Sequence, residues 1–124
     1  MTRFQRFEEI EAWQRARELA NAVYDASDDG PFARDFGLRD QARKSAVSVL
    51  SNIAEGFERE SRAEFIRFLT IAKGSAGELR AQLYIASDRG YLAPELSARL
   101  RNEAARVSKM LAGPMASLRR PSCS

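Results

Sequence analysis

Apolar residues recur at three- and four-residue intervals along most of the chain, which is the spacing of an amphipathic helix and not the two-residue alternation of a strand. Four such stretches predict helices at residues 7–27, 38–56, 61–89 and 94–112. Glycine and proline separate them: Gly30-Pro31 follows the first, Gly56 ends the second and Gly90 follows the third. Short connections favour antiparallel neighbours, so the pattern predicts an all-α, up-down-up-down four-helix bundle, with residues 1–124 forming one domain.

The third stretch gives the clearest pattern. Ser61 and Glu64 have the spacing of a capping box, in which each side chain bonds to the backbone of the other residue. The apolar positions that follow keep a heptad spacing, which predicts one long buried face. These positions are Phe65, Phe68, Leu69, Ala72, Ala76, Leu79, Leu83 and Ala86.

The fourth stretch has a less certain end. Pro94 suits the first turn of a helix, where its missing N–H removes no hydrogen bond. Gly113-Pro114 is expected to end or kink this helix, and residues 119–124 are expected to form a mobile tail. That tail holds Cys123, the single cysteine, which cannot form a disulfide within the chain and fits a reducing compartment.

The composition excludes several kinds of chemistry. The chain has no histidine, so it lacks Ser-His and Cys-His pairs and the Glu-x-x-His motifs of di-iron bundles. We therefore expect no catalytic residue, no metal site, no cofactor and no small-molecule substrate. No stretch reaches the roughly 20 apolar residues of a membrane span, and the N-terminus has no secretory h-region, so the expected location is the cytoplasm without membrane contact.

The formal net charge of +3 is unevenly distributed along the chain. Four basic and seven acidic residues lie in 1–30, whereas six basic and two acidic residues lie in 91–124. A basic C-terminal half is a candidate surface for phosphate-bearing partners, since lysine and arginine contact phosphates. The alternative is an ordinary solvated surface. The candidate residues for nucleic-acid binding are Arg67, Lys73, Arg80, Arg99, Arg106 and Lys109.

Two features predict contact between copies of the chain. Gly74 and Gly77 lie opposite the apolar face of the third helix, and a glycine within a helix costs about 1 kcal/mol relative to alanine. The second helix has an apolar arc, including Leu50 and Phe57, that is wider than one seam requires. Close approach by another protomer accounts for both features. The alternative is a pair of tolerated, exposed glycines.

Ionisable residues also fall within the apolar arcs. Arg43 and Arg17 are two, and Glu55 and Glu78 offer the only carboxylate pair considered for acid–base catalysis. A charge in such a position must be paired or must extend to the surface. We favour pairing of one glutamate with Arg43 or Arg17, within or between protomers, because no nucleophile or glycine-rich loop accompanies the carboxylates.

Several motifs resemble one family. The most specific are Ser51-Asn52-Ile53-Ala54-Glu55-Gly56-Phe57, Gly74-Ser75 with Glu78-Leu79, and Gly90-Tyr91-Leu92, preceded by Trp13-Gln14-Arg15-Ala16. Over residues 7–92 the chain resembles the four-helix bundle proteins named for 23S rRNA intervening sequences. It departs from their pattern at Gly30-Pro31-Phe32, where that family more often has Phe-Pro.

This resemblance implies an antiparallel four-helix bundle that assembles as a barrel-like homopentamer. It also implies kinship with the accessory variability determinant of diversity-generating retroelements, which binds nucleic acid and works beside a reverse transcriptase. The family's recurring polar positions correspond to Arg43, Asn52, Glu55 and Glu78, which we interpret as structural or interface residues.

The main hypothesis is a non-enzymatic oligomeric binding module whose partner is RNA or DNA, a ribonucleoprotein or a reverse transcriptase. The alternative is a protein-interaction scaffold that binds no nucleic acid. An enzyme that uses Glu55 and Glu78 is the third hypothesis.

Overall fold

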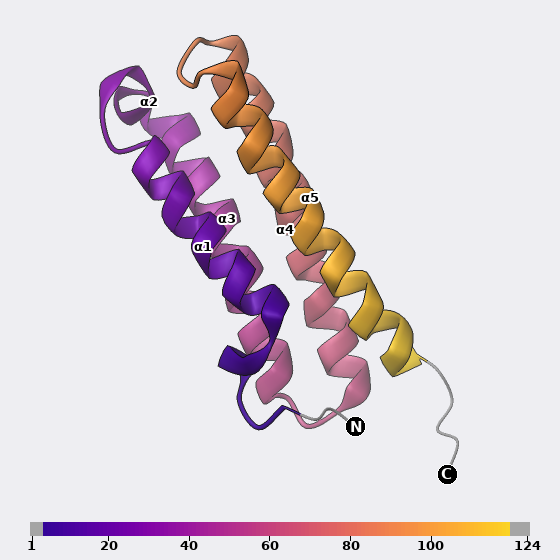
Figure 1. The fold of residues 1–124 in the computed structure, drawn as a ribbon. Helices are drawn as coiled ribbons and strands as arrows, with labels where there is room; N and C mark the ends of the chain where they lie inside the picture. Colours follow the sequence, from indigo (N-terminus) through magenta and orange to yellow (C-terminus); the bar gives the residue numbers. More distant parts are fainter. Residues whose placement is uncertain (1–3, 120–124) are drawn as a thin grey trace.

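The computed structural model describes residues 4–119, and helices account for most of them (Figure 1). A single turn of 3-10 helix precedes the α-helices, and these residues contain no β-strand. The all-helical four-helix bundle is therefore confirmed, with a short additional helix, α2, between the first two long ones. The elements are η1 (Phe7–Glu9), α1 (Glu11–Ala26), α2 (Gly30–Arg34), α3 (Phe36–Glu58), α4 (Arg62–Asp88) and α5 (Pro94–Arg119).

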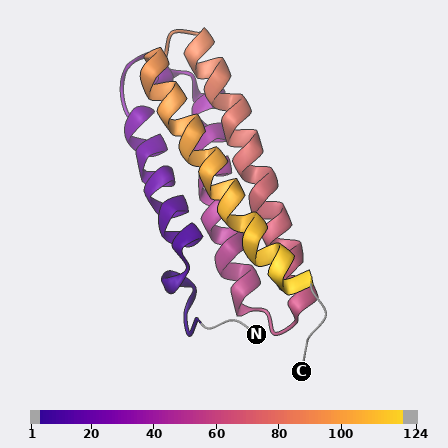
Figure 2. The same ribbon diagram turned by 45° about the vertical axis from the view of Figure 1, so that its right-hand side comes forward.

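The four long helices form a ring in which each packs against two others: α1 on α3, α3 on α4, α4 on α5 and α5 on α1. Figure 1 shows consecutive long helices running in opposite directions, with their connections alternating between the two ends of the bundle. Figure 2 shows α4 and α5 side by side. No helix within the described residues combines the length and the apolar composition that crossing a membrane requires.

The core consists of two buried apolar clusters, one towards each end of the bundle. All the heptad positions predicted for the third helix are buried, and all but Phe68 belong to these two clusters. Alanine is frequent in both clusters, with Ala16, Ala42, Ala72 and Ala104 among the fully buried residues. Small side chains at these positions allow the helix backbones to approach closely, because protein interiors are packed without gaps.

Gly56 marks the closest approach of α3 to α4. A Cβ atom at this glycine would lie 2.7 Å from Cβ of Phe68 and 3.0 Å from Cδ1 of Phe65. The sequence predicted a helix end at Gly56, but α3 continues to Glu58. The glycine is therefore needed for packing rather than for termination. By contrast, Gly90 has a φ of +75° directly after α4, where a left-handed residue ends the helix.

Helix α3 begins two residues earlier than predicted because Asp35 caps it. Its Oδ1 accepts a hydrogen bond from the backbone N–H of Leu38 at 3.1 Å, which satisfies one of the unpaired donors of the first turn. Oδ2 of the same carboxylate accepts from the Tyr91 hydroxyl at 3.0 Å. Tyr91 also stacks on Phe32 of α2, with ring centroids 5.7 Å apart. The cap thus ties α2 to the connection between α4 and α5.

The first helix begins later than predicted. Residues 7–9 form the turn η1, and Ile10 has an extended backbone that separates this turn from α1. Ile10 is buried in the core, and the ring of Phe7 packs edge-on against Trp13 with centroids 5.1 Å apart. The bend at Ile10 therefore buries apolar side chains that a continuous helix would direct elsewhere.

The predicted end of the fourth helix at residue 112 is wrong. Helix α5 passes through Gly113-Pro114 and continues to Arg119, although a proline cannot donate the usual backbone hydrogen bond to residue i−4. Met115, one residue beyond this proline, is buried in the core, and its sulfur lies 3.5 Å from Oγ1 of Thr70. Burial of Met115 against α4 accounts for the continuation. Beyond Arg119, the predicted mobile tail and Cys123 lie outside the described residues.

Replacement of Gly56 tests the helix contact. Gly56→Ala should lower the free energy of unfolding by about 1–2 kcal/mol, because overpacking costs about 1–3 kcal/mol and the better helix propensity of alanine returns up to about 1 kcal/mol. Urea denaturation measures this difference. Gly77→Ala is the matched control: nothing lies within 4 Å of the added atom, so stability should rise by up to about 1 kcal/mol. Equal midpoints for the two variants would contradict the packing role.

Candidate functional site

A basic surface with one exposed aromatic ring runs along the junction of α4 and α5. We call Lys73, Arg80, Tyr84 and Arg101 the α4/α5 stripe. The guanidinium carbon of Arg101 lies 4.0 Å from the centroid of the Tyr84 ring, and 52% of Tyr84 is exposed. Nε of Arg101 also donates to the carbonyl and the hydroxyl of Ser97, both at 3.3 Å. These bonds fix the guanidinium over the ring.

Lys73 and Arg80 lie on the same side of α4 as Tyr84. They precede it by eleven and four residues, which are spacings of whole helical turns, and both are exposed. No carboxylate occurs on this side of α4 between Lys73 and Tyr84; Asp88 follows one turn later. On α5, Arg101 is preceded and followed at one-turn spacing by Ala98 and Ala105. The stripe is therefore positive along most of its length.

The other predicted nucleic-acid residues do not join this stripe. Arg67 lies over the ring of Phe68 and bonds to Glu64 on its own helix. On α5, Arg106 approaches Glu103 at 4.0 Å, and Glu103 also pairs with Arg15 of α1 at 3.6 Å. Arg99 lines a groove between α1 and α5 that Arg15 and Glu103 also border. Lys109 is exposed on α5. The structure thus divides the predicted set among three surfaces.

Sequence reasoning did not select Tyr84 and Arg101 for binding. A signal was present, since Tyr84 falls outside the heptad of buried positions and four residues after Arg80. Its pairing with Arg101 depends on the antiparallel register of α4 and α5. The hydrogen bond from the Ser97 hydroxyl to the Leu83 carbonyl, at 3.1 Å, reports this register. Periodicity within one helix does not contain that information.

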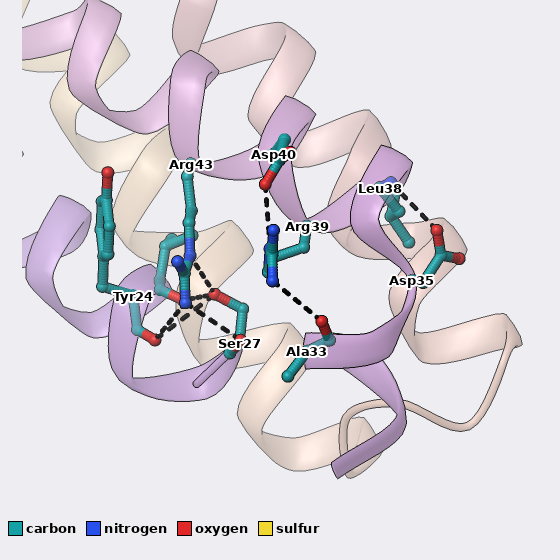
Figure 3. A network of polar contacts seen from close by, with 9 residues as sticks. Tyr24, Ser27, Ala33, Asp35, Leu38, Arg39, Asp40 and Arg43 are labelled. Atoms are coloured by element: carbon teal, nitrogen blue, oxygen red, sulfur yellow. Dashed lines mark hydrogen bonds and ion pairs between the residues drawn. The ribbon is translucent and has the colours of Figure 1, made fainter. Parts of the chain in front are cut away.

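Arg43 binds the end of α1 (Figure 3), and it binds no glutamate among residues 4–119. Its Nε donates to Oγ of Ser27 at 2.8 Å, and its Nη2 donates to the carbonyl of Ser27 at 3.0 Å and to that of Tyr24 at 3.4 Å. The guanidinium also stacks on the Tyr24 ring at 4.4 Å. Carbonyls at a helix C-terminus have no partner within the helix, and a cation there is favourable. The predicted pairing of Arg43 with Glu55 or Glu78 is wrong within one chain.

Arg17, the other predicted cation, lies over the ring of Trp13 at 5.8 Å. It likewise makes no ion pair with Glu55 or Glu78 in the described chain. Nε1 of Trp13 is buried and has no hydrogen-bond partner among residues 4–119. An open groove of about 500 Å³ runs along this part of α1. Trp13 lines one part of it, and polar side chains line the rest.

Three of the four polar positions implied by the family resemblance lie along the junction of α3 and α4. Asn52 donates from Nδ2 to the carbonyl and hydroxyl of Ser48, at 2.8 and 2.9 Å. The Ser48 hydroxyl in turn lies 2.8 Å from the Ser75 hydroxyl across the junction. Glu55 follows Asn52 by one turn and Glu78 follows Ser75 by one turn, on the same side of each helix. Asn52 therefore has a structural role between the helices.

Glu55 and Glu78 both lie on the surface of the bundle. Oε2 of Glu55 binds Nη2 of Arg59 at 2.8 Å on the same helix, and both glutamates are exposed. Neither lines any of the three surface grooves found in the described part of the chain. No group of three or more acidic or cysteine side chains within residues 4–119 is arranged to hold a metal ion.

The predicted oligomer residues divide into two groups. Leu50 and Phe57 are half-buried and pack on the core, so the wide apolar arc of α3 is used inside the bundle, where this helix contacts both α1 and α4. Packing within the bundle therefore explains much of this arc, and contact with another copy at Leu50 and Phe57 stays a prediction. Gly74 and Gly77 are exposed on α4, with nothing within 4 Å of an added Cβ atom. They remain available for close contact.

A family model described as 23S rRNA-intervening sequence protein matches residues 8–113. The chain belongs to this family. The match covers all of the long helices except the last turns of α5, so the four-helix bundle described above is the family's part of the chain.

The bundle is also similar to a solved structure from Bacteroides thetaiotaomicron, described as a protein with unknown function from the S23 ribosomal protein family. The TM-score is 0.77 at 24% identity, covering 84% of this chain and 97% of that one. This likeness establishes the fold. No curated protein matches the chain. Neither the description of the family nor that of the solved structure names a catalytic activity.

Arg43→Lys tests the cap on α1. Lysine keeps the charge but has no planar fork that bonds to Ser27 and Tyr24 together, so the free energy of unfolding should fall by roughly 1–2 kcal/mol. Thermal or urea denaturation provides the measurement. Arg34→Lys is the matched control, because Arg34 is exposed at the end of α2, and its stability should match that of the original protein. An unchanged midpoint for Arg43→Lys would show that water replaces these bonds without loss.

Proposed function

We propose that the protein is a non-enzymatic, oligomeric module that binds structured nucleic acid, free or within a ribonucleoprotein, through the α4/α5 stripe. The observation that supports this most directly is the set of three cations and one exposed tyrosine along two adjacent helices, without a carboxylate between them. The family's name, which refers to 23S rRNA, agrees with a nucleic-acid partner. The exposure of both Glu55 and Glu78, the carboxylates that the sequence offered for acid–base catalysis, supports a binding role rather than catalysis.

Electrostatics favour the stripe over the rest of the basic surface. Arg67 and Arg106 each have a carboxylate partner, whereas Lys73 and Arg80 make no ion pair with any described residue. A phosphate at Lys73 or Arg80 gains a contact without breaking an internal one. Binding of this kind releases counterions from the nucleic acid, and its affinity falls as salt rises.

The salt dependence of binding tests this proposal. The double variant Lys73→Gln/Arg80→Gln should bind RNA more weakly and lower the slope of log K against log salt by about 1–2, because two phosphate contacts are removed. Fluorescence anisotropy with a labelled RNA hairpin, titrated at several salt concentrations, measures this slope. Arg99→Gln/Arg106→Gln is the matched control and should change the slope less. Absence of salt-dependent binding by the original protein would favour the protein-interaction scaffold.

The outward side of α4 supports self-association. Ile71 and Ile85 are 40% and 49% exposed, and Gly74 and Glu78 lie between them at spacings that place all four on one face. Two exposed isoleucines beside an open glycine are typical of a surface that another helix covers closely. Glu78 has no cationic partner within residues 4–119, so a covering surface must supply one or leave the carboxylate at its edge.

A second copy of the chain offers a complementary surface at the junction of α1 and α3. Tyr24 and Val47 are exposed there, and Arg17 lies seven residues before Tyr24 on the same side of α1. Contact between this surface and the outward side of α4 joins two different patches. Such head-to-tail contacts form a closed ring when the rotation from one copy to the next brings the last copy back against the first. A ring of five copies is the assembly that the family resemblance implies, and we propose it here.

Gly74→Gln tests the assembly. In a single bundle the longer side chain meets open space and replaces a poor helix former, so folding should be unaffected or slightly stabilised. At an interface it should keep the helices apart and shift the mass measured by light scattering towards that of the monomer. Ala112→Gln, at an exposed position on α5, is the matched control and should leave the mass unchanged. A monomeric original protein would contradict the ring.

A further inference from the structure

Tyr84 combines an exposed aromatic ring with an arginine partner that binds no carboxylate among residues 4–119, on a side of α4 that also carries Lys73 and Arg80. Arginines lie over aromatic rings at several other places, and three of these arginines bind a carboxylate, whereas Arg101 and Arg43 bind only neutral oxygens. Arg43 binds carbonyls of α1, Arg59 binds Glu55, and Arg67 binds Glu64. Arg39, over Phe36, binds Asp40 at 2.9 Å. Figure 3 shows the contact between Arg39 and Asp40. At Tyr84, by contrast, a half-exposed ring lies within a stripe of positive charge.

We propose that Tyr84, held against Arg101, is a stacking platform for an unpaired base, with Lys73 and Arg80 on the neighbouring phosphates. This inference rests on the proposed function and specifies its ligand as single-stranded nucleic acid or an unpaired segment of a folded RNA. Any base can stack on an aromatic ring, so the platform is indifferent to sequence. The bases of a duplex already stack on each other within the helix and offer no face to Tyr84.

The geometry of the stripe fits a short single strand. From Lys73 to Tyr84 the rise of α4 is about 16 Å at 1.5 Å per residue. At about 3.4 Å per nucleotide, the spacing of a fully stacked strand, this length spans at most roughly five nucleotides. Arg101 fixes the ring before binding, through its contact at 4.0 Å and its hydrogen bonds to Ser97. A ring held in place loses little conformational freedom when a base stacks on it.

The test compares a labelled oligothymidylate of about 20 nucleotides, several times the length of the stripe, with its duplex with oligoadenylate. Tyr84→Ala should weaken binding of the single strand roughly 5- to 150-fold, the range that corresponds to one aromatic–base stack. The affinity for the duplex should change by less than about twofold, because only phosphate contacts remain there. Tyr84→Phe keeps the ring and should retain single-strand binding.

Phe36→Ala is the matched control, since it also removes an exposed aromatic ring from beneath an arginine, but beside Asp40 instead of lysine. It should leave both affinities unchanged. Denaturation midpoints of all variants confirm that the bundle is intact. Two results would contradict base stacking on Tyr84 and leave the proposed function standing. One is an equal loss of affinity for single strand and duplex in Tyr84→Ala; the other is no loss of affinity in Tyr84→Ala while salt-dependent binding persists. No binding of either oligonucleotide at low salt would overturn both.

Discussion

The close contact between α3 and α4 is the constraint on which the rest of the structure depends. Gly56 leaves space for Phe68, and the Ser48 and Ser75 hydroxyls meet at 2.8 Å, so small residues line the contact at two levels. Helices approach closely only where side chains are small, because a filled interior has no room for an added methyl group. Helix α4 packs against α3 on one side and against α5 on the other. Its heptad face is therefore buried, and its opposite face is exposed to solvent.

That outward face of α4 divides into two surfaces of different chemistry. Towards α5 it carries Lys73, Arg80 and Tyr84, and towards α3 it carries Ile71 and Ile85. Charged and apolar side chains therefore separate within one helix. The two proposed contacts, with nucleic acid and with another copy, use adjacent and distinct surfaces, so one protein can make both at once.

Arginine has several structural roles in this bundle, and these roles determine which cations remain available. Arg43 caps α1 and Arg15 joins α1 to α5 through Glu103, and both are used within the chain. Arginine suits such sites because its planar guanidinium stacks on rings and forms several bonds at once. A count of all the cations in the chain therefore overestimates the number that can bind phosphate. The relevant quantity is the set of cations without an internal partner.

The sequence by itself determined the fold class, because heptad spacing in residues 65–86 and glycine between the helices leave few other ways to bury the apolar face. It also identified Gly74 and Gly77 as lying opposite the buried face, and it identified Ser61 as the cap of α4, whose hydroxyl accepts from the N–H of Glu64 at 2.9 Å. Each of these properties depends on residues a few positions apart, where helical geometry fixes the relation.

Only the tertiary structure decided the relations between helices. It paired Arg43 with the end of α1 instead of with Glu55, placed Phe57 against the core, and carried α5 past Gly113-Pro114 because Met115 is buried. It also brought Arg101 over Tyr84 and so joined one aromatic ring to the basic stripe. Periodicity gives the face on which a residue lies, but the register and packing of neighbouring helices determine which residue it meets.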